Sequence, residues 1–305
     1  MRNRIAPIAA VLSMIAVLLS AAGQPALADR LSELALDGPA RVRIEAGWFT
    51  MGSDDADVAH AVRLCQAGGA RGPVCARERF AHEQPRHRVH SSAYLIDRTE
   101  VTNAAYRRCV GESVCAPPRL SESDLRLAHP RHPVAGVSHG EAQRYCRWVG
   151  GRLPTEAQWE RAARGGSQRR YPWGQHYNSR VANHGDGRGD VDLLDGYRFA
   201  APVGALSDGR SAHGLHDMGG NVWEWTADFY ADSAYEQHRG VDPRGPAHGE
   251  GHVIRGGSWR SPPYTLRATH RGSLRPDDAR PDVGFRCAYN VPRAAPAPAP
   301  GRKSP

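Results

Sequence analysis

Glycine and proline recur along the whole of this chain, with 33 glycines and 23 prolines among its 305 residues. Glycine favours turns, and proline interrupts the hydrogen bonding of helices and inner strands. Long regular elements are therefore excluded. The pattern predicts an irregular α+β domain with few helices, short strands and long ordered loops, and the chain is long enough for one such large domain.

The N-terminus is typical of an exported protein. Arg2 and Arg4 precede an apolar run from Ile5 to about Leu19, and Ala26-Leu27-Ala28 offers a small-x-small cleavage site. The alternative, a membrane anchor, is disfavoured because the run is short and interrupted. We therefore expect a periplasmic or secreted protein without a membrane span. The predicted segments are a signal peptide (1–28), a lead-in (29–40), a single domain (41–290) and a disordered Pro/Ala-rich tail (291–305).

The formal charge of +8 overstates the basic character of the domain. Five of the basic residues lie in the two ends, so about +3 remains for the body of the chain. No basic stripe interleaved with aromatic residues is present, and we do not expect nucleic acid as a partner.

An even number of cysteines in an exported chain predicts disulfides. Cys65 and Cys75 lie in one glycine-rich loop, and Cys109 and Cys115 flank a short turn, so each pair can close locally. Cys146 and Cys287 remain. The alternative, a structural metal site, is disfavoured because the chain contains no C-x-x-C motif.

Two helices are predicted most clearly. Ser138 precedes Glu141, and Thr155 precedes Gln158, at the spacing of a capping box. The predicted helices are 139–149, 156–164 and one through about Cys109 that follows Glu100. The predicted strands are an early hairpin within 42–51, then 87–90, 93–97, 251–255 and 284–288.

Three longer motifs carry a family resemblance. They are Gly151-Arg-Leu-Pro-Thr-Glu-Ala-Gln-Trp-Glu160, Asn221-Val-Trp-Glu-Trp225, and Val253-Ile-Arg-Gly-Gly-Ser-Trp-Arg260 followed by Gly284-Phe-Arg-Cys287. Together they resemble the sulfatase-modifying-factor family, which includes the formylglycine-generating enzyme, over about residues 40–290. The resemblance implies a C-type-lectin-like fold and a disulfide between Cys146 and Cys287.

The copper-binding cysteines of that family are missing. The enzymes carry a CxxxxC pair shortly after the Gly-Gly-Ser turn, where this chain has Ser261 at the first position and Pro263 to Thr265 around the second. Cu(I) is a soft ion that prefers thiolates, and hydroxyl groups do not replace them. Copper is therefore not an expected cofactor.

The resemblance also implies two calcium sites, because calcium takes oxygen ligands from carboxylates, amides and carbonyls. The first set consists of Asp217, the carbonyl oxygens of Gly220 and Val222, and Glu224. The second set consists of Asn183, the His184 carbonyl oxygen, Asp195 and the Tyr197 carbonyl oxygen. The alternatives are aromatic core packing around the first motif and an acidic solvated loop around the second.

A substrate groove is implied as well. The residues that match its lining are Trp223, Ser258, Arg255, Arg260 and Arg267. A tryptophan face and arginine forks suit an extended chain or a carboxylate. The alternative for Arg255, and for Arg286, is a buried structural role.

The wider superfamily includes pyoverdine-maturation proteins and ergothioneine-type non-haem iron proteins. Two histidines and a carboxylate are the minimum for such an iron site. The residues that offer this set are His184, His213, His216 and His270, with Asp217 or Glu224. A serine hydrolase is not expected, because no Gly-x-Ser-x-Gly motif occurs.

The sequence therefore favours an exported, calcium-stabilised protein of this family. The leading hypothesis is an oxidative maturation enzyme or accessory factor for a periplasmic peptide or protein that does not use the two-cysteine copper mechanism. The alternative is a non-catalytic module that binds a peptide, a protein or an envelope partner on the same scaffold.

Overall fold

The computed structural model describes residues 39–120, 122–186, 193–237 and 240–292. The predicted signal peptide, most of the lead-in and the tail from residue 293 lie outside these ranges. All elements described belong to the unit that begins at Arg41. Among the described helices, none has the length and apolar character needed to cross a membrane.

Helices are few and strands are short. The α-helices are α3 (Asp55–Ala67), α4 (Asn103–Gly111), α5 (His139–Trp148), α6 (Glu156–Arg164) and α7 (Ala234–Gln237). The 3-10 helices are η2 (Gly72–Cys75), η3 (Arg77–Glu83), η4 (Glu122–Ala128), η5 (Ser179–Val181), η6 (Ser207–Gly209) and η7 (Pro263–Leu266). The strands are β1 (Arg41–Ile44), β2 (Gly47–Met51), β3 (His87–Ser91), β4 (Tyr94–Asp97), β5 (Trp223–Phe229), β6 (Gly240–Val241), β7 (His252–Arg255), β8 (Arg271–Leu274), β9 (Val283–Gly284) and β10 (Ala288–Asn290).

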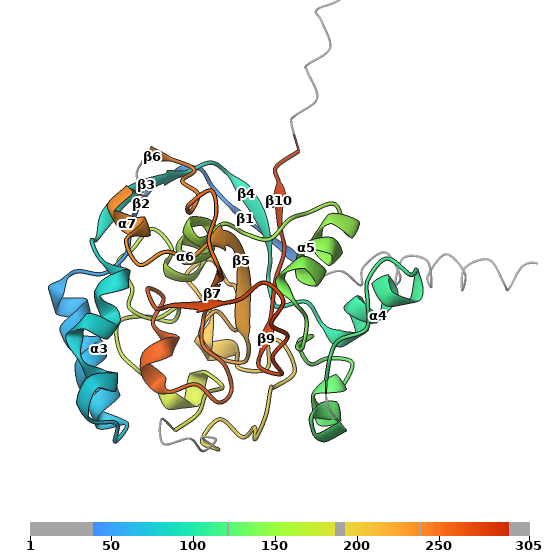
Figure 1. Ribbon diagram of the computed structural model, residues 1–305, viewed down its shortest axis with the longest axis horizontal. Helices are drawn as coiled ribbons and strands as arrows, with labels where there is room; N and C mark the ends of the chain where they lie inside the picture. Colours follow the sequence, from blue (N-terminus) through green and yellow to red (C-terminus); the bar gives the residue numbers. More distant parts are fainter. Residues whose placement is uncertain (1–38, 121, 187–192, 238–239, 293–305) are drawn as a thin grey trace, which may run out of the picture. The chain divides into compact units, whose positions relative to one another are not determined.

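The strands form three small sheets, in the orders β1-β4-β10, β2-β3-β6 and β8-β7-β5-β9. Helices α4 and α5 lie on one side of the third sheet, and α3 lies on the other side (Figure 1). This is the irregular α+β architecture that the glycine and proline content predicts.

The predicted early hairpin is wrong. β1 and β2 do not pair with each other: β1 pairs with β4, and β2 pairs with β3, so residues 41–51 and 87–97 form one long bent antiparallel pair. The link between β1 and β2 is held by Arg161, which donates to the carbonyl oxygens of Glu45 and Gly47. A side chain from α6 therefore takes the place of the turn hydrogen bonds that the local sequence suggested.

Both capping boxes are present. Ser138 begins α5 and Thr155 begins α6, and in each case the N-cap and N3 residues exchange hydrogen bonds. These contacts satisfy amide groups that a helix start otherwise leaves unpaired. The two predicted helices are confirmed, to within one residue at the end of α5.

Helix α3 was not predicted. Its buried residues Val58, Ala61 and Cys65 follow a helical spacing, and Asp54 caps its start. Cys65 therefore lies in the last turn of a helix and Cys75 at the end of η2, rather than in one glycine-rich loop.

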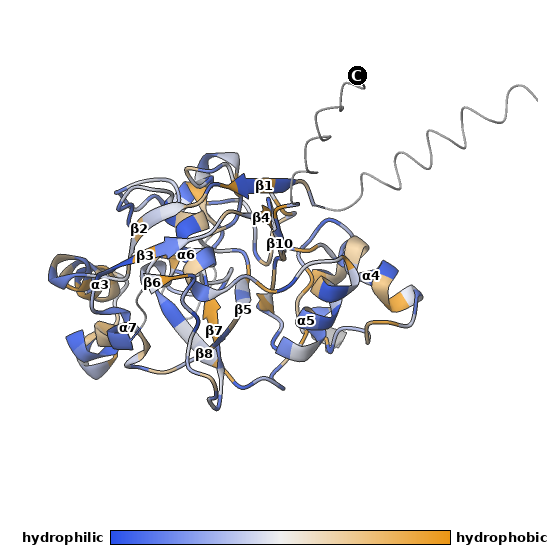
Figure 2. Cartoon of the chain, turned by 90° about the horizontal axis from the view of Figure 1, so that it is seen from above, coloured by the Kyte–Doolittle hydropathy of each residue, from blue (hydrophilic) through white to orange (hydrophobic). Residues whose placement is uncertain are grey.

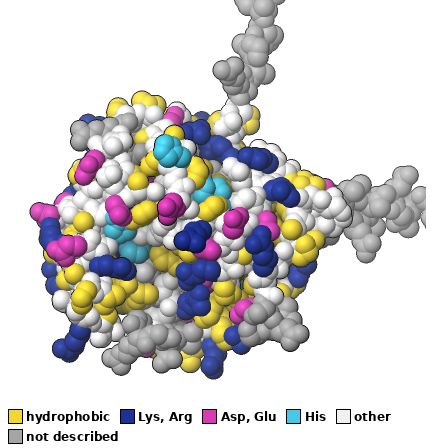
Figure 3. Space-filling view, in the orientation of Figure 1, with side chains coloured by type: hydrophobic (Ala, Val, Ile, Leu, Met, Phe, Trp, Pro, Cys, Tyr) yellow, Lys and Arg dark blue, Asp and Glu magenta, His cyan; other side chains and the backbone are white. Residues whose placement is uncertain are grey.

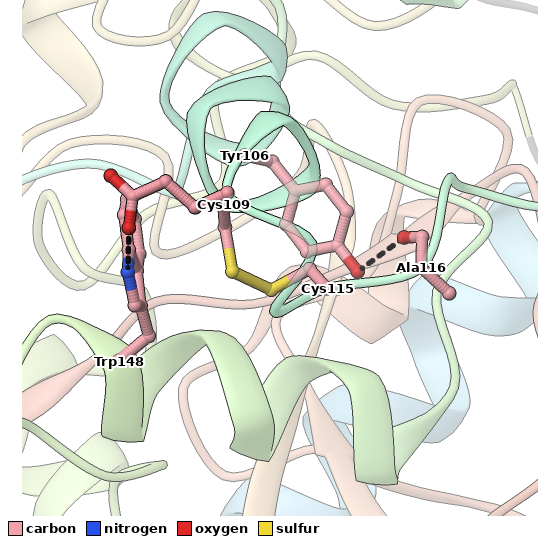
Figure 4. Close-up of a disulfide and its surroundings, with 6 residues drawn as sticks. Tyr106, Cys109, Cys115, Ala116 and Trp148 are labelled. Atoms are coloured by element: carbon pink, nitrogen blue, oxygen red, sulfur yellow. Dashed lines mark hydrogen bonds between the residues drawn. A yellow bond between two sulfur atoms is a disulfide. The ribbon is translucent and has the colours of Figure 1, made fainter.

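All three disulfides are confirmed. Cys65 bonds to Cys75, Cys109 to Cys115, and Cys146 to Cys287 across 141 residues of sequence. Figure 4 shows the Cys109–Cys115 bond beside Tyr106, whose hydroxyl donates to the carbonyl oxygen of Ala116 at 3.1 Å. The long-range bond joins α5 to the segment between β9 and β10.

The main core packs α4 and α5 against the third sheet. Trp225, Phe285 and Tyr145 are buried there around the Cys146–Cys287 bond. The hydrophobic stretch of β7 lies in the interior of the unit (Figure 2), where Val253 and Ile254 are buried. The loops that follow β5 and β7 therefore begin at strands that are packed in the core.

Candidate functional site

An open cleft of about 1060 Å³ lies beside the third sheet. Its lining comes from four parts of the chain: the segment 74–84 with η3, the start of β5, the segment 230–236 that leads into α7, and residues 254–282 with η7 and β8. On the face seen in Figure 3, acidic, basic, histidine and hydrophobic side chains are interspersed. That surface mixes charges of both signs, which differs from the basic stripe of a nucleic-acid interface.

Two of the predicted groove residues line the cleft. Trp223 is mostly buried and contributes to its wall, and Arg260 contributes while pairing with Asp282 at 2.8 Å. Ser258 lies behind the surface. Its hydroxyl donates to Asp282 at 3.0 Å and is 2.8 Å from the hydroxyl of Ser261, which does line the cleft.

The other two predicted groove residues do not line the cleft. Arg255 is fully buried, with Nη2 2.6 Å from Glu160. Arg267 is also buried and donates to both oxygens of Glu83 at 2.7 Å. Neither guanidinium is available to a ligand, because each neutralises a buried carboxylate.

The positions of the missing copper cysteines fall on the cleft wall. Ser261, at the first position, lines it, and so does Thr265 at the end of the segment 263–265 around the second, where its hydroxyl donates to the Pro262 carbonyl oxygen at 2.7 Å. These groups are hard oxygen donors that are already hydrogen-bonded, so they do not fit a Cu(I) site.

Two histidines line the cleft close together, His82 of η3 and His270 just before β8. Their ring centres are 6.2 Å apart and their planes are nearly perpendicular. Burial, together with the charge of Arg267, lowers the pKa of His270 to about 4, although Glu83 acts in the opposite direction. Burial also lowers the pKa of His82. Both imidazoles are therefore neutral at pH 7.

Within the first predicted calcium set, Glu224 is fully paired. It is buried and accepts two hydrogen bonds from Arg286, both 2.7 Å, and a third from Trp159 at 2.8 Å. Asp217 accepts from the amide of Gly204 at 2.7 Å. Glu224 is therefore neutralised by an arginine, which makes it a poor partner for a second cation.

A different carboxylate accompanies Asp217. Glu100 is fully buried and lies near Asp217. Burial and the neighbouring charge of Asp217 raise the pKa of Glu100 well above its usual range. Its Oε1 accepts from the amide of Asn221 at 3.0 Å, and Oε2 is a buried oxygen without a hydrogen-bond donor among the described residues. Such an oxygen fits a cation ligand.

The second predicted calcium set has one clear feature of a cation site. The side-chain amide of Asn183 donates to the Phe199 carbonyl oxygen at 2.8 Å, which fixes its orientation. Its Oδ1 then lies buried with no donor in the described part of the chain. Asp195 accepts from the amide of Tyr197 at 2.8 Å. His184 Nε2 contacts the hydroxyl of Tyr177 at 3.0 Å. An amide oxygen and a carboxylate are ligand types that calcium takes, while residues 187–192, which lie between Asn183 and Asp195 in the sequence, are outside the described ranges.

The predicted iron ligands are not assembled. Among residues 39–292, apart from the undescribed gaps, no group of three or more His, Cys, Asp or Glu residues is placed to hold a metal ion. His270 instead contacts Glu83, and His184 contacts Tyr177. The set of two histidines and a carboxylate proposed from the sequence therefore does not fit this structure.

The sequence did not identify several cleft residues. His82 lies in η3, and Tyr230 and Tyr264 lie on two other segments of the wall. None belongs to a recognisable motif. Only the fold brings them together.

Comparison with known proteins agrees with this architecture. A family model described as the sulfatase-modifying factor enzyme 1-like domain matches residues 28–291. The formylglycine-generating enzyme of Bos taurus is 34% identical over 304 residues, which span 81% of this chain and 74% of that enzyme. The inactive C-alpha-formylglycine-generating enzyme 2 of Mus musculus is 40% identical over 170 residues, which span 53% of this chain and 50% of that protein.

Among solved structures, PvdO from Pseudomonas aeruginosa superimposes with a TM-score of 0.64 at 28% identity, covering 83% of this chain and 95% of that one. The family model and the structural superposition each cover most of the domain described above. The chain belongs to the sulfatase-modifying factor enzyme 1-like family.

Proposed function

We propose that this protein is an exported maturation factor that binds an extended segment of a peptide or protein in the cleft, without a two-cysteine copper centre. The observation that carries the proposal is the position of the cleft. The Gly-Gly-Ser turn and the start of β5 line it or lie directly behind it, and its wall includes Ser261, at the first missing thiol position, and Thr265, in the segment 263–265 around the second.

The cleft suits a chain segment rather than a compact small molecule. Its volume, about 1060 Å³, is at the upper end of typical ligand sites, and it is open to solvent. Trp223, Tyr230 and Tyr264 offer aromatic surface, while Arg260 and Glu236 lie at its polar parts. Aromatic side chains with charged groups around them are typical of peptide-binding surfaces.

Location outside the cytoplasm and calcium binding belong to the same proposal. Three disulfides are typical of an oxidising compartment. The buried oxygen of Asn183 and the Glu100–Asp217 pair are the oxygen donors that would hold calcium, whose role would be to order long loops.

A peptide array tests the proposal. Extended ten-residue peptides are offered to the untagged exported chain and to two variants of it. Tyr264→Ala removes an aromatic side chain of the cleft, and Trp48→Ala removes an exposed tryptophan of β2 as the matched control. We expect a subset of peptides to bind the protein and the control equally, and to bind Tyr264→Ala at least tenfold more weakly. Equal binding to all three proteins would contradict the proposal.

The mass of the bound peptides distinguishes a maturation enzyme from a non-catalytic module. A change in peptide mass after incubation in air indicates an oxidative enzyme. Unchanged mass favours the second candidate function, a binding module. The observation in favour of the module is that Ser261 and the segment 263–265, which contain no thiol, stand where the resemblance places the copper-binding cysteines.

A further inference from the structure

The two cleft histidines are anchored in the same way, although 188 residues separate them in sequence. The Nδ1 atom of His270 is 3.1 Å from Oε1 of Glu83. Glu83 is fully buried and both of its oxygens accept from Arg267 at 2.7 Å, so it is paired as a carboxylate and can only accept. Nη2 of Arg267 lies 3.3 Å from the same Nδ1, but this nitrogen already donates to Glu83 at 2.7 Å, and the shorter contact of Nδ1 is the one with the carboxylate. We therefore assign the proton of His270 to Nδ1, which leaves Nε2 as the nitrogen with a lone pair.

His82 is anchored through a tyrosine. Its Nδ1 is 2.8 Å from the hydroxyl oxygen of Tyr230, and that hydroxyl donates to Asp232 at 2.7 Å. Because Tyr230 donates to the carboxylate, its oxygen accepts the Nδ1–H of His82. The lone pair of His82 is thus also on Nε2.

Both Nε2 atoms are open to the cleft. Neither makes a hydrogen bond to another described residue, and neither is among the buried nitrogens that lack a partner. Two neutral imidazoles whose Nδ1–H groups are held by carboxylates, directly or through a phenol, have the arrangement of metal-ligating histidines.

We propose that His82 and His270 form a transition-metal site in the cleft, with Nε2 of each ring as ligand. A transition metal bound to imidazole lies about 2 Å from nitrogen and so about 3 Å from the ring centre. The 6.2 Å between the two ring centres therefore fits one ion only with the two Nε2 atoms on opposite sides of it. The protein supplies only two ligands, so the remaining coordination positions are open to water or to atoms of a bound substrate.

The chemistry of the ligands selects the class of ion. Imidazole nitrogen suits copper, zinc, iron and nickel, whereas calcium and magnesium prefer oxygen. Copper(II) binds most tightly in the divalent series, and is the probe of choice. Glu83 and Tyr230 act as positioning residues that fix which nitrogen of each ring faces the ion.

The test uses the full exported chain without an affinity tag, stripped with chelator and dialysed against Cu²⁺ in the presence of calcium. We expect one copper per chain and an electron paramagnetic resonance spectrum with splitting from two imidazole nitrogens. His82→Asn and His270→Asn should each weaken binding at least tenfold, and His248→Asn, which changes an exposed histidine, should leave it unchanged. Tyr230→Phe keeps both ligands but removes the anchor of His82, and should weaken binding about tenfold.

Copper that binds equally to the wild type, His82→Asn and His270→Asn would overturn the site, as would less than one equivalent in the wild type. The spectrum of the wild type decides the question even if a variant fails to fold, because splitting from no nitrogen or one nitrogen contradicts a two-histidine site. No peptide is present in this assay, so its outcome is independent of the peptide-binding test.

Discussion

Arg286 and Glu224 form a two-point ion pair with no solvent exposure, with Nε 2.7 Å from Oε2 and Nη2 2.7 Å from Oε1. Both residues belong to motifs that carried the family resemblance, one in Gly284-Phe-Arg-Cys287 and one in the Trp-Glu-Trp motif. The pair joins the β9–β10 segment to β5. The role of Glu224 in this structure is therefore to neutralise an arginine that lies inside the fold.

Replacement of Glu224 by Gln should destabilise the fold by about 3–5 kcal/mol, because it leaves a buried guanidinium without its counter-charge. The loss should be the same with calcium and with chelator. Urea denaturation under both conditions measures it, with Glu45→Gln as a control at an exposed ion pair. A loss that appears only in the presence of calcium would instead make Glu224 a calcium ligand.

Asn183→Ala should abolish most of the stabilisation that calcium gives, because it removes the buried oxygen that lacks a donor. Calcium at about 100 times its dissociation constant stabilises a protein by about 2.7 kcal/mol. Thermal melting with and without calcium measures the effect, and Asn178→Ala, at an exposed amide nearby, is the control. If the melting temperature of the wild-type protein is the same with and without calcium, this assignment is contradicted.

His139 and His252 should make the fold sensitive to acid. Their rings are stacked with centres 3.5 Å apart. Burial, and then the neighbouring His252, lowers the pKa of His139 to about 4, and burial lowers the pKa of His252. The unfolded chain therefore binds more protons than the folded one between about pH 6.5 and 4. This contribution to stability is fully present above pH 6.5 and is lost as the pH falls.

Two buried carboxyl groups act in the opposite direction. Burial raises the pKa of Asp228 to about 6 and that of Asp97 to about 7, so their protonation in acid favours the folded state. Comparing the pH dependence of stability between variants and the wild type separates the contribution of the histidines from that of the carboxyl groups. His139→Gln should flatten the loss of stability between pH 6.5 and 4 by about 2–3 kcal/mol, while His129→Gln, at an exposed position, should not. Parallel curves for His139→Gln and the wild type would contradict the stacking argument.

The long-range disulfide should contribute more stability than the short one. In the chain-entropy model, a bond that closes 141 residues is worth about 5 kcal/mol, and one that closes six is worth about 2 kcal/mol. Paired Cys→Ala replacements at Cys146 and Cys287, and separately at Cys109 and Cys115, provide the comparison by urea denaturation. Equal losses would show that the enthalpy of local packing, rather than loop closure, dominates.

Local signals in the sequence predicted local structure well. The capping boxes at Ser138 and Thr155 were read directly, because the side chains that form them are three residues apart. The family motifs supplied the fold and the pairing of Cys146 with Cys287. By contrast, the turn between β1 and β2 depends on Arg161, more than a hundred residues away. No local pattern reveals such a partner.

The same reason limits the prediction of the site. Arginine is a residue type that is expected in a substrate groove. Arg255 and Arg267 are instead paired with buried carboxylates from α6 and η3, which are distant in sequence. His82 was not predicted for the same reason, because no sequence motif marks η3, the element in which it lies. Residue type and motif position identified the region of the cleft, whereas burial decided which side chains reach it.

Hydrogen–deuterium exchange with a bound peptide tests the central claim most directly, because it locates the binding surface without a variant. The account predicts that a peptide selected on the array slows exchange in η3, in η7 and in β8, the elements that line the cleft. Protection confined to the sheet β2-β3-β6, or spread evenly over the domain, would place the binding surface elsewhere and contradict the proposed function.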